Sequence, residues 1–170
     1  MSKKIYLSPS NQNGNTYATG GTNEMAQCDK IAAAAAKALK RCGFDVMVAK
    51  SGTLMQTRCP ESDKFGADIH MPIHTNAFNG KYTGGTRVFC LNSNGRKALS
   101  VYVECEFHDT VTGSDWIRKN TVAIGEAICK GMCNYFDVKY KTDSAGSDSS
   151  KAGSDKAFRR YIVRITSSNG

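Results

Sequence analysis

Short apolar runs of strand length recur along the chain and are separated by polar and glycine-rich segments. Runs of this kind favour β-strands, because a buried strand needs only a few apolar residues and ends at Gly, Pro, Asn or Asp. We expect strands at "KIYLSPS", "FDVMVA", "DIHMPIHTN", "TRVFCL" and "SVYVECEF". Pro72 falls in the third of these segments and cannot donate a ladder hydrogen bond, so we expect it near the end of that strand.

The segment between the first two strands is typical of a long helix. Its central part, "KIAAAAAKALKR", has high helix propensity, and Thr22 or Asn23 can cap its start with Glu24 in the first turn. Gly43 is placed for a left-handed cap at its end. The order strand, helix, strand is the unit of a parallel sheet. A turn followed by a short helix is predicted next, over residues 52–67.

A second long helix is predicted from Ser114 to about residue 136, where apolar residues recur at helical spacing. Its expected buried stripe consists of Ile117, Ile124, Ile128 and Tyr135. Together, these patterns predict an α/β fold with a single domain, a mostly parallel twisted sheet flanked by helices.

Changes in composition along the chain divide it into three segments. Residues 1–140 are assigned to the α/β domain. Residues 141–157 are rich in Gly, Ser and Asp and are predicted to be a linker, because such a segment cannot bury a core. Residues 158–170 return to strand-like alternation, which indicates a docked strand or the stub of a second module.

Length and hydropathy restrict the class of protein. The 170 residues, 40% of them hydrophobic, suit one domain with a real core. No apolar run approaches the roughly 18 residues of a membrane span. The first residues, "MSKKIYLSPSNQ", lack the apolar region of a signal peptide. We therefore expect a soluble polypeptide that is made in the cytoplasm without an export signal.

The seven cysteines are an odd number and form no CxxC motif, a pattern that favours reduced thiols over a disulfide framework. Cys129 and Cys133 lie one helical turn apart, and packing is the favoured role for them, with metal binding as the alternative.

Basic residues outnumber acidic residues by 23 to 15, which gives a net charge of +8 and favours an anionic partner. Nucleic acid, an anionic cell wall and a membrane surface all fit this charge. The basic residues are scattered, however, and no aromatic-interleaved basic patch occurs, so nucleic acid is the least favoured of these.

Polar residues that could carry chemistry follow several of the predicted strands. Gln12 lies just after the first strand, His74 ends the third, Glu104 lies near the end of the last, and Glu24 opens the first helix. In a parallel sheet these positions meet at one edge. Histidine and carboxylate ligands with one open position describe a hydrolytic zinc site. Taken singly, a histidine at a strand end is more often structural, and an acid at a helix start often only complements the helix dipole.

Several segments, in order, match a known family: "KIYLSPSNQNGN", "GGTNE", "RCGFDVMV", "ADIHMPIHTNA", "GGTRVF" and "VYVECEFHD". Over about residues 3–137 the chain resembles the zinc-dependent N-acetylmuramoyl-L-alanine amidases of the family-3 type, in particular phage endolysin and clostridial versions. These enzymes cleave the amide bond between N-acetylmuramic acid and the L-alanine of the peptidoglycan stem peptide. The resemblance implies the same fold and activity for this chain.

The resemblance also implies roles for individual residues. Glu24 and His74 correspond to zinc ligands, and Glu104 corresponds to the general base. Glu106 is a rival base, although it stands at a position that is usually small in the family, and two residues apart on one strand share a face. The cofactor implied is Zn²⁺.

The main departure from the family lies in "SPSNQNG", where the family pattern is Asp-Pro-Gly-His-Gly-Gly and its histidine is a third ligand. Asn11 or Gln12 stands in that place, and we favour Gln12 as the third ligand. A neutral amide oxygen is a weaker zinc ligand than imidazole. His70 is disfavoured, because on a strand it would lie about 13 Å from His74.

Three further residues fall in matching segments. Asn76 and His108 are candidates for substrate binding, with turn-building and loop roles as the alternatives. Arg58 matches a recurring arginine for which a structural ion pair is the alternative.

The connection between the fourth and fifth strands and the C-terminal tail also differ in length from those of the family. Only "NSNGRKAL" joins the fourth and fifth strands, whereas a parallel crossover needs a dozen or more residues, so a reduced groove or an omitted segment is expected. The tail "YIVRITSSNG" looks like the start of a bacterial SH3-type wall-binding module.

The leading hypothesis is therefore a zinc amidase acting on bacterial peptidoglycan, an endolysin or autolysin that reaches the wall after phage, prophage or mother-cell lysis. The alternative is an amidase-like module that has lost the histidine ligand and only binds peptidoglycan. A basic nucleic-acid-binding domain comes third.

Overall fold

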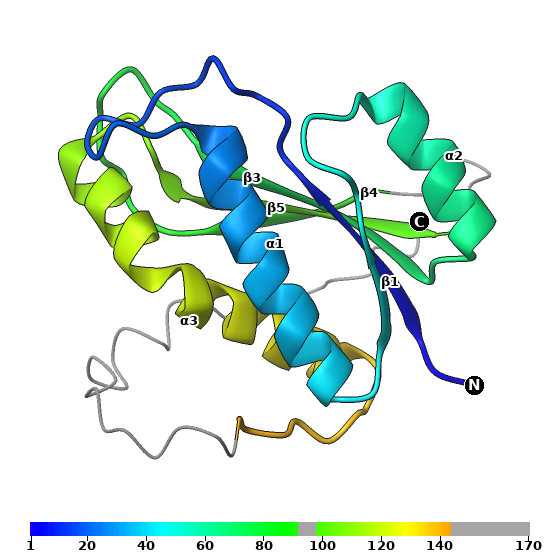
Figure 1. Cartoon of the computed structure of the whole chain (residues 1–170). Helices are drawn as coiled ribbons and strands as arrows, with labels where there is room; N and C mark the ends of the chain where they lie inside the picture. The colour runs from blue at the N-terminus through cyan, green and yellow to red at the C-terminus, as the bar shows by residue number, and fades with distance from the viewer. Residues whose placement is uncertain (92–97, 144–170) are drawn as a thin grey trace.

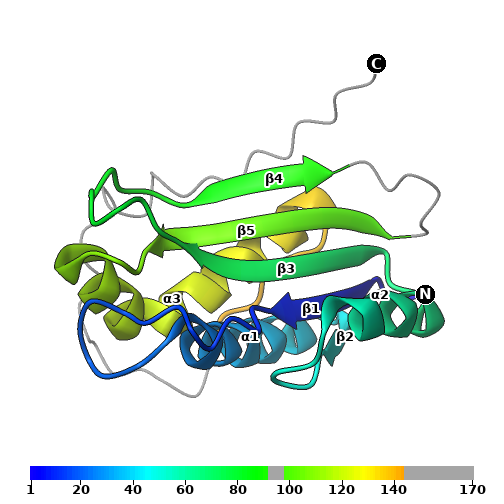
Figure 2. The same ribbon diagram turned by 90° about the horizontal axis from the view of Figure 1, so that it is seen from above.

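A five-stranded sheet in the order β2-β1-β3-β5-β4 organises the computed structural model, which describes residues 1–91 and 98–143 (Figures 1 and 2). The strands are β1 (Lys4–Pro9), β2 (Asp45–Val48), β3 (Ile69–Asn76), β4 (Arg87–Leu91) and β5 (Leu99–Phe107), and the helices are α1 (Glu24–Arg41), α2 (Met55–Phe65) and α3 (Val111–Tyr135). The strands β2, β1, β3 and β5 run parallel to one another. The predicted fold class, a mostly parallel sheet flanked by helices, is confirmed.

The two faces of the sheet are covered by different helices (Figure 1). Ile5 and Leu7 of β1 belong to the main core with α1 and α3, whereas Tyr6 points to the other face and packs near the end of α2. This division follows from the two-residue period of a strand. α1 and α3 approach closely because Gly125 of α3 meets the alanine-rich part of α1, where a Cβ would lie only 2.6 Å from the nitrogen of Ala35.

Both ends of α1 form as the sequence predicts. The side chain of Asn23 accepts a hydrogen bond from the nitrogen of Ala26, which identifies Asn23 rather than Thr22 as the N-cap. After the helix, Gly43 adopts φ of +93°, a conformation that costs glycine little. α1 therefore begins at a fixed point, with Glu24 as its first residue.

The position of Pro72 differs from the prediction. It lies in the interior of β3, opposite Ser8 of β1, rather than near the strand's end. The pairing of β3 with β5 is interrupted at Met71 and Pro72 and resumes at Ile73. The interruption falls where Pro72 has no N–H to donate, which explains how a central strand accommodates a proline.

The pairing of β4 also corrects an expectation. β4 runs antiparallel to β5, with Val88 opposite Val103 and Leu91 opposite Ser100. An antiparallel pair needs no long crossover, so the short "NSNGRKAL" connection requires no omitted segment. Residues 92–97 of that connection lie outside the described part of the chain.

α3 begins three residues earlier than predicted, at Val111, because Thr110 caps it through a bond from the nitrogen of Gly113. Ile117, Ile124 and Ile128 form the expected buried stripe. Tyr135 does not belong to it, since it is 46% exposed at the last turn of the helix. The buried face continues instead through Met132 and Cys133.

Residues 136–143 run back along the domain, and Val138 and Tyr140 pack against the main core. The first residues of the predicted linker contact α1, where Arg41 donates a hydrogen bond from Nε to the carbonyl of Lys141 at 2.8 Å. The rest of the predicted linker and the C-terminal strand or SH3-type stub, residues 144–170, lie outside the described residues. Within the described ranges, no helix has the length and apolar character that crossing a membrane requires.

Arg58 of α2 is buried beneath the end of β1, with 1% of its surface exposed. Its Nη1 donates to the carbonyl of Pro9 and, at 3.2 Å, to the hydroxyl of Ser8, and its Nε donates to Thr53 at 3.0 Å. These partners are neutral oxygens. The observed contacts therefore tie the last residues of β1 to the loop before α2, and none of them is to a carboxylate.

We expect Arg58→Ala to destabilise the protein by at least about 1–3 kcal/mol, the cost of leaving buried acceptors without a donor. Chemical denaturation measures this change. Arg58→Lys is the matched variant: it keeps the charge but not the planar donor geometry, and we expect it to recover only part of the loss. Full stability in Arg58→Ala would show that the buried guanidinium does not hold the end of β1.

Candidate active site

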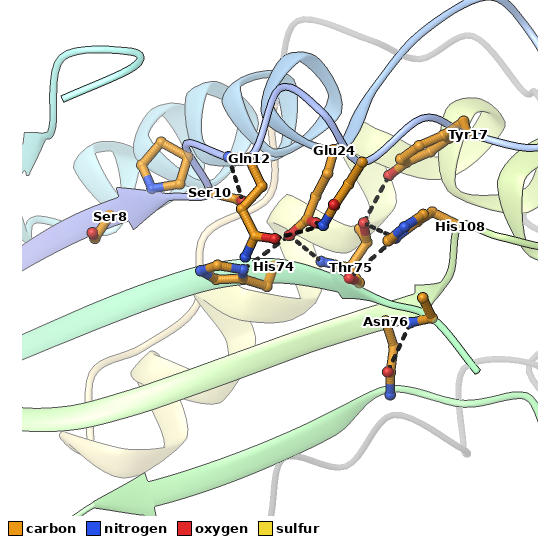
Figure 3. A network of polar contacts seen from close by, with 12 residues as sticks. Ser8, Ser10, Gln12, Tyr17, Glu24, His74, Thr75, Asn76 and His108 are labelled. Atoms are coloured by element: carbon orange, nitrogen blue, oxygen red, sulfur yellow. Dashed lines mark hydrogen bonds and ion pairs between the residues drawn. The ribbon is translucent and has the colours of Figure 1, made fainter. Parts of the chain in front are cut away.

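The carboxyl ends of β1, β3 and β5 and the first turn of α1 meet at one edge of the sheet. Figure 3 shows the side chains of Gln12, Glu24 and His74 pointing toward one another at this edge. Because β3 and β5 are parallel and in register, Glu104 lies directly opposite His74. The structure therefore brings together all four residues for which the sequence predicts a metal-binding or general-base role.

Glu24 and His74 form the centre of the site. Nδ1 of His74 lies 2.9 Å from Oε1 of Glu24, and the Glu24 side chain is only 1% exposed. Asn15 donates to Oε2 of Glu24 at 2.6 Å, and the backbone nitrogen of Thr75 donates to Oε1 at 3.4 Å. Burial raises the pKa of Glu24, but hydrogen bonds from His74, Asn15 and Ser10 outweigh it and hold the pKa below its ordinary value. Glu24 is therefore an ionised carboxylate at neutral pH.

The two candidates for the third ligand point in different directions. Asn15 donates to Oε1 of Gln12 at 2.6 Å as well as to Glu24, so a single amide bridges the two side chains. Asn11 instead donates from Nδ2 to the carbonyl of Thr53, in the loop before α2. The geometry favours Gln12 over Asn11 as the residue beside the Glu24 and His74 pair.

Glu104 lies on the same face of the sheet as Tyr102, whose ring stacks on His74 with centroids 4.9 Å apart. Burial raises the pKa of Glu104, and neither the hydrogen bond from Tyr102 nor the neighbouring charge of His74 cancels this effect. Oε2 of Glu104 is buried and has no hydrogen-bond partner among the described residues. The pKa values of two carboxylates in one site are thus displaced in opposite directions, a pattern typical of sites in which two carboxylates have different roles.

Glu106 does not share the position of Glu104, although it follows by only two residues. A register shift pairs Cys105 with Thr75 and Phe107 with Asn76, so Glu106 is the extra residue of a bulge, with φ of +41°. Its Oε1 accepts from the hydroxyl of Tyr82 at 3.0 Å and from the nitrogen of Gly85 at 3.1 Å. These contacts hold the segment between β3 and β4 and favour a positioning role for Glu106.

We expect Glu106→Gln to retain most activity, because a glutamine Oε1 can accept the same two hydrogen bonds. Removing a general base instead costs about 10²–10⁴-fold. Release of amino groups from purified cell walls measures the difference. A loss of that size in Glu106→Gln would assign the base role to Glu106.

Asn76 and His108, the candidates for substrate binding, are occupied by contacts within the protein. Asn76 accepts from the nitrogen of Ala77 at 2.8 Å. His108 is 4% exposed, its Nδ1 lies 2.9 Å from the hydroxyl of Thr75, and its ring stacks on Tyr17 (Figure 3). These contacts favour the turn-building and positioning alternatives, and substrate contact by either residue stays a prediction.

His70, the disfavoured ligand candidate, is buried on β3 with its ring 5.0 Å from that of Tyr6. It lies four residues before His74 on an unbroken strand, as expected.

Sequence reasoning missed two residues of the site. Asn15, which bridges Gln12 and Glu24, lies in a Gly/Asn-rich loop whose path carries no periodic signal. Tyr102, which contacts both His74 and Glu104, could have been found, because it lies two residues before Glu104 on the same strand and therefore on the same face.

The residues of the site fit a zinc ion. Imidazole and carboxylate are ordinary zinc ligands, and an amide oxygen is a weaker one. The 2.9 Å between Nδ1 of His74 and Oε1 of Glu24 is close to the roughly 3.3 Å separating two ligand atoms of one tetrahedral zinc ion. The unpartnered Oε2 of Glu104 supplies a free acceptor beside this pair.

Comparison with known proteins gives a consistent picture. A family model described as N-acetylmuramoyl-L-alanine amidase matches residues 9–100, more than half of the chain. A search of curated proteins gives no significant match.

Solved structures of amidases share the fold. An N-acetylmuramoyl-L-alanine amidase from Clostridium difficile 630 has a TM-score of 0.72 at 18% identity, over 85% of this chain and 99% of its own. The catalytic domain of an amidase from Bacillus (Paenibacillus) polymyxa has a TM-score of 0.71 at 13% identity, covering 81% and 99%. The catalytic domain of an endolysin targeting Clostridium difficile has a TM-score of 0.62 at 20% identity, covering 78% and 97%.

Proposed function

Because the chain belongs to the N-acetylmuramoyl-L-alanine amidase family, we propose that it is a zinc-dependent hydrolase cleaving the bond between N-acetylmuramic acid and L-alanine in peptidoglycan. The observation that carries the proposal is the grouping of His74, Glu24 and Glu104 at one sheet edge. Family membership supports amidase activity. The zinc dependence and the residue roles rest on this geometry.

Glu24 and His74 would hold the ion, with Gln12 as the third ligand. When bound, zinc supplies a Lewis acid for the scissile carbonyl. The ionised Glu24 suits this role because its hydrogen bonds keep it deprotonated.

Glu104 is proposed to act as the general base. Its free Oε2 can accept the proton of the attacking water. The proton is then delivered to the nitrogen of the departing L-alanine, which leaves as a neutral amine. The raised pKa of Glu104 favours the first transfer, because a carboxylate with a higher pKa is a stronger base toward the water. The phenol of Tyr102, hydrogen-bonded to the carboxylate, keeps Glu104 oriented.

Action on the wall also fits the net charge of +8, since an anionic wall attracts a basic protein. We propose an endolysin or autolysin role, in which the enzyme meets peptidoglycan after cell lysis.

Hydrolysis of purified cell walls tests the proposal. We expect the wild-type chain to release new amino groups and no new reducing sugars, to lose activity with a chelator and to recover it with Zn²⁺. Sedimentation with walls without any new amino groups, even with added zinc, would reject the enzyme in favour of the peptidoglycan-binding module. Activity that resists the chelator would reject the zinc dependence alone.

The third ligand gives a separate prediction. We expect Gln12→Ala to raise the zinc concentration that half-restores activity of the metal-free enzyme by about 10–100-fold, the range found for residues supporting a metal site. Asn11→Ala is the matched control, because its side chain bonds the loop at Thr53 instead. A larger effect in Asn11→Ala than in Gln12→Ala would reverse the assignment.

A further inference from the structure

Three buried cysteines from two helices converge at the end of α1 remote from Glu24. Cys42 caps α1, and Cys129 and Cys133 lie one turn apart on α3. The Sγ atoms of Cys129 and Cys42 are 3.5 Å apart, those of Cys129 and Cys133 are 4.0 Å apart, and all three lie within 4.8 Å of one another. In the part of the chain that the structure describes, no other group of three His, Cys, Asp or Glu side chains converges in this way.

The two shorter Sγ–Sγ distances, 3.5 and 4.0 Å, are close to those between thiolates that share one metal ion. At a metal–sulfur distance of about 2.3 Å, two sulfur ligands lie about 3.8 Å apart in a tetrahedral site and about 4.0 Å apart in a trigonal one. A disulfide would need its sulfur atoms at about 2.05 Å. Thiols packed as ordinary apolar side chains also touch at about 3.5–4.0 Å, so a direct measurement of metal binding decides between the two roles.

One backbone contact suits negative sulfur. The backbone nitrogen of Lys141 donates to Sγ of Cys42 at 3.3 Å. Burial raises the pKa of Cys133 to about 11, and the charge of Arg41 offsets only a small part of this effect, so Cys133 is a thiol at neutral pH until a metal ion binds. Burial also raises the pKa of Cys129. The guanidinium of Arg41 is itself paired with Glu126, 2.6 Å from Nη2 to Oε2, and with Asp143, 3.9 Å from Nη1 to Oδ2. An apolar thiol does not need this N–H donor.

We propose that Cys42, Cys129 and Cys133 bind a thiolate-preferring d¹⁰ metal ion, Zn²⁺ or Cu⁺, which joins the end of α1 to α3. Soft thiolate ligands select these ions. Binding releases the three thiol protons to solvent. Three thiolates complete a trigonal site for Cu⁺, whereas Zn²⁺ would take a fourth ligand, water or the carbonyl of Lys141, which lies 3.8 Å from Sγ of Cys42.

The site is separate from the candidate active site. α1 has 18 residues, and its length of about 27 Å separates Glu24 at one end from Cys42 at the other. Figure 1 shows the lower part of α1 crossing α3, so the proposed ion would join two helices whose contact supports the sheet. Its role is structural, independent of amide hydrolysis.

A metal titration of the full chain tests the proposal, in a Glu24→Gln, His74→Ala background that removes the candidate catalytic ligands. The protein is reduced, stripped of metal and titrated with Cd²⁺, which gives an ultraviolet thiolate charge-transfer band. We expect one equivalent to bind with this band, and competition with Zn²⁺ and with Cu⁺ then identifies the preferred ion. Absence of the band in this chain, in which all cysteines are intact, would overturn the proposal.

Single variants then assign the band. We expect Cys129→Ser to lose it and Cys90→Ser, at an exposed cysteine, to keep it. Thermal unfolding gives a second readout: the metal should raise the unfolding midpoint of the Cys90→Ser chain and leave that of Cys129→Ser unchanged. A full band in Cys129→Ser would assign the metal to other thiols and overturn the site. A reduced, metal-free chain that re-forms a Cys42–Cys129 disulfide in preference to taking up any ion would overturn it as well.

Discussion

Glu104→Gln is expected to lower amidase activity by about 10²–10⁴-fold while raising the thermal stability of the metal-free protein at neutral pH. The activity is lost because glutamine cannot accept the proton of the attacking water. The stability rises because Glu104 is partly buried with a carboxylate oxygen that has no hydrogen-bond partner in the described residues. Cell-wall hydrolysis and thermal unfolding of the same preparations measure the two effects.

The pH dependence of this stability gain has a definite sign. The pKa of Glu104 in the folded state is raised above that in the unfolded chain. Ionisation of Glu104 therefore destabilises the folded state as the pH rises through that pKa, and the gain in Glu104→Gln should be present at pH 7 and absent below about pH 4, the ordinary range for glutamate. Equal unfolding midpoints of wild type and Glu104→Gln at pH 7 would contradict the raised pKa.

His74→Ala and Glu24→Gln are expected to bind one equivalent of zinc less than the wild type and to lose activity together with it. Each change removes a charged or imidazole ligand, so we expect a loss of zinc affinity exceeding the about 10–100-fold found when only a supporting residue is removed. Metal analysis after dialysis against a competing chelator measures the stoichiometry. The difference in zinc content between each variant and the wild type gives the zinc that depends on Glu24 and His74.

His70→Gln provides the control for this prediction. His70 is the other histidine of β3, and its ring packs against Tyr6. This variant should leave the zinc stoichiometry unchanged. A His74→Ala protein that keeps the same zinc content as the wild type would show that His74 is not a ligand, whatever its activity.

The fold was predictable from sequence because its signals are local. The alanine-rich helix with Asn23 and Gly43 at its ends, and the short apolar strands, all form where propensity and capping place them. Pairing direction is not a local property. The antiparallel β4 and the interior position of Pro72 depend on which strand lies alongside, and period-two alternation is the same for both directions.

The candidate site was predictable in part for a similar reason. Glu24, His74 and Glu104 end or begin regular elements, so a parallel sheet brings them to one edge. The roles of Glu106 and Asn15 depend on a bulge and on an irregular loop, and neither has a sequence period. Spacing alone placed Glu104 and Glu106 on the same face of the strand. The bulge at Glu106, with its positive φ, turns the two side chains apart.

The antiparallel β4 has a practical consequence for engineering. Leu91, the last residue of β4, and Leu99, the first residue of β5, both lie at the amino end of β5, whereas Glu104 lies toward its carboxyl end in the candidate active site. Peptide tags or whole domains spliced between these two leucines should be carried at the remote end of the sheet. That junction is therefore a suitable insertion point for a fused wall-targeting module.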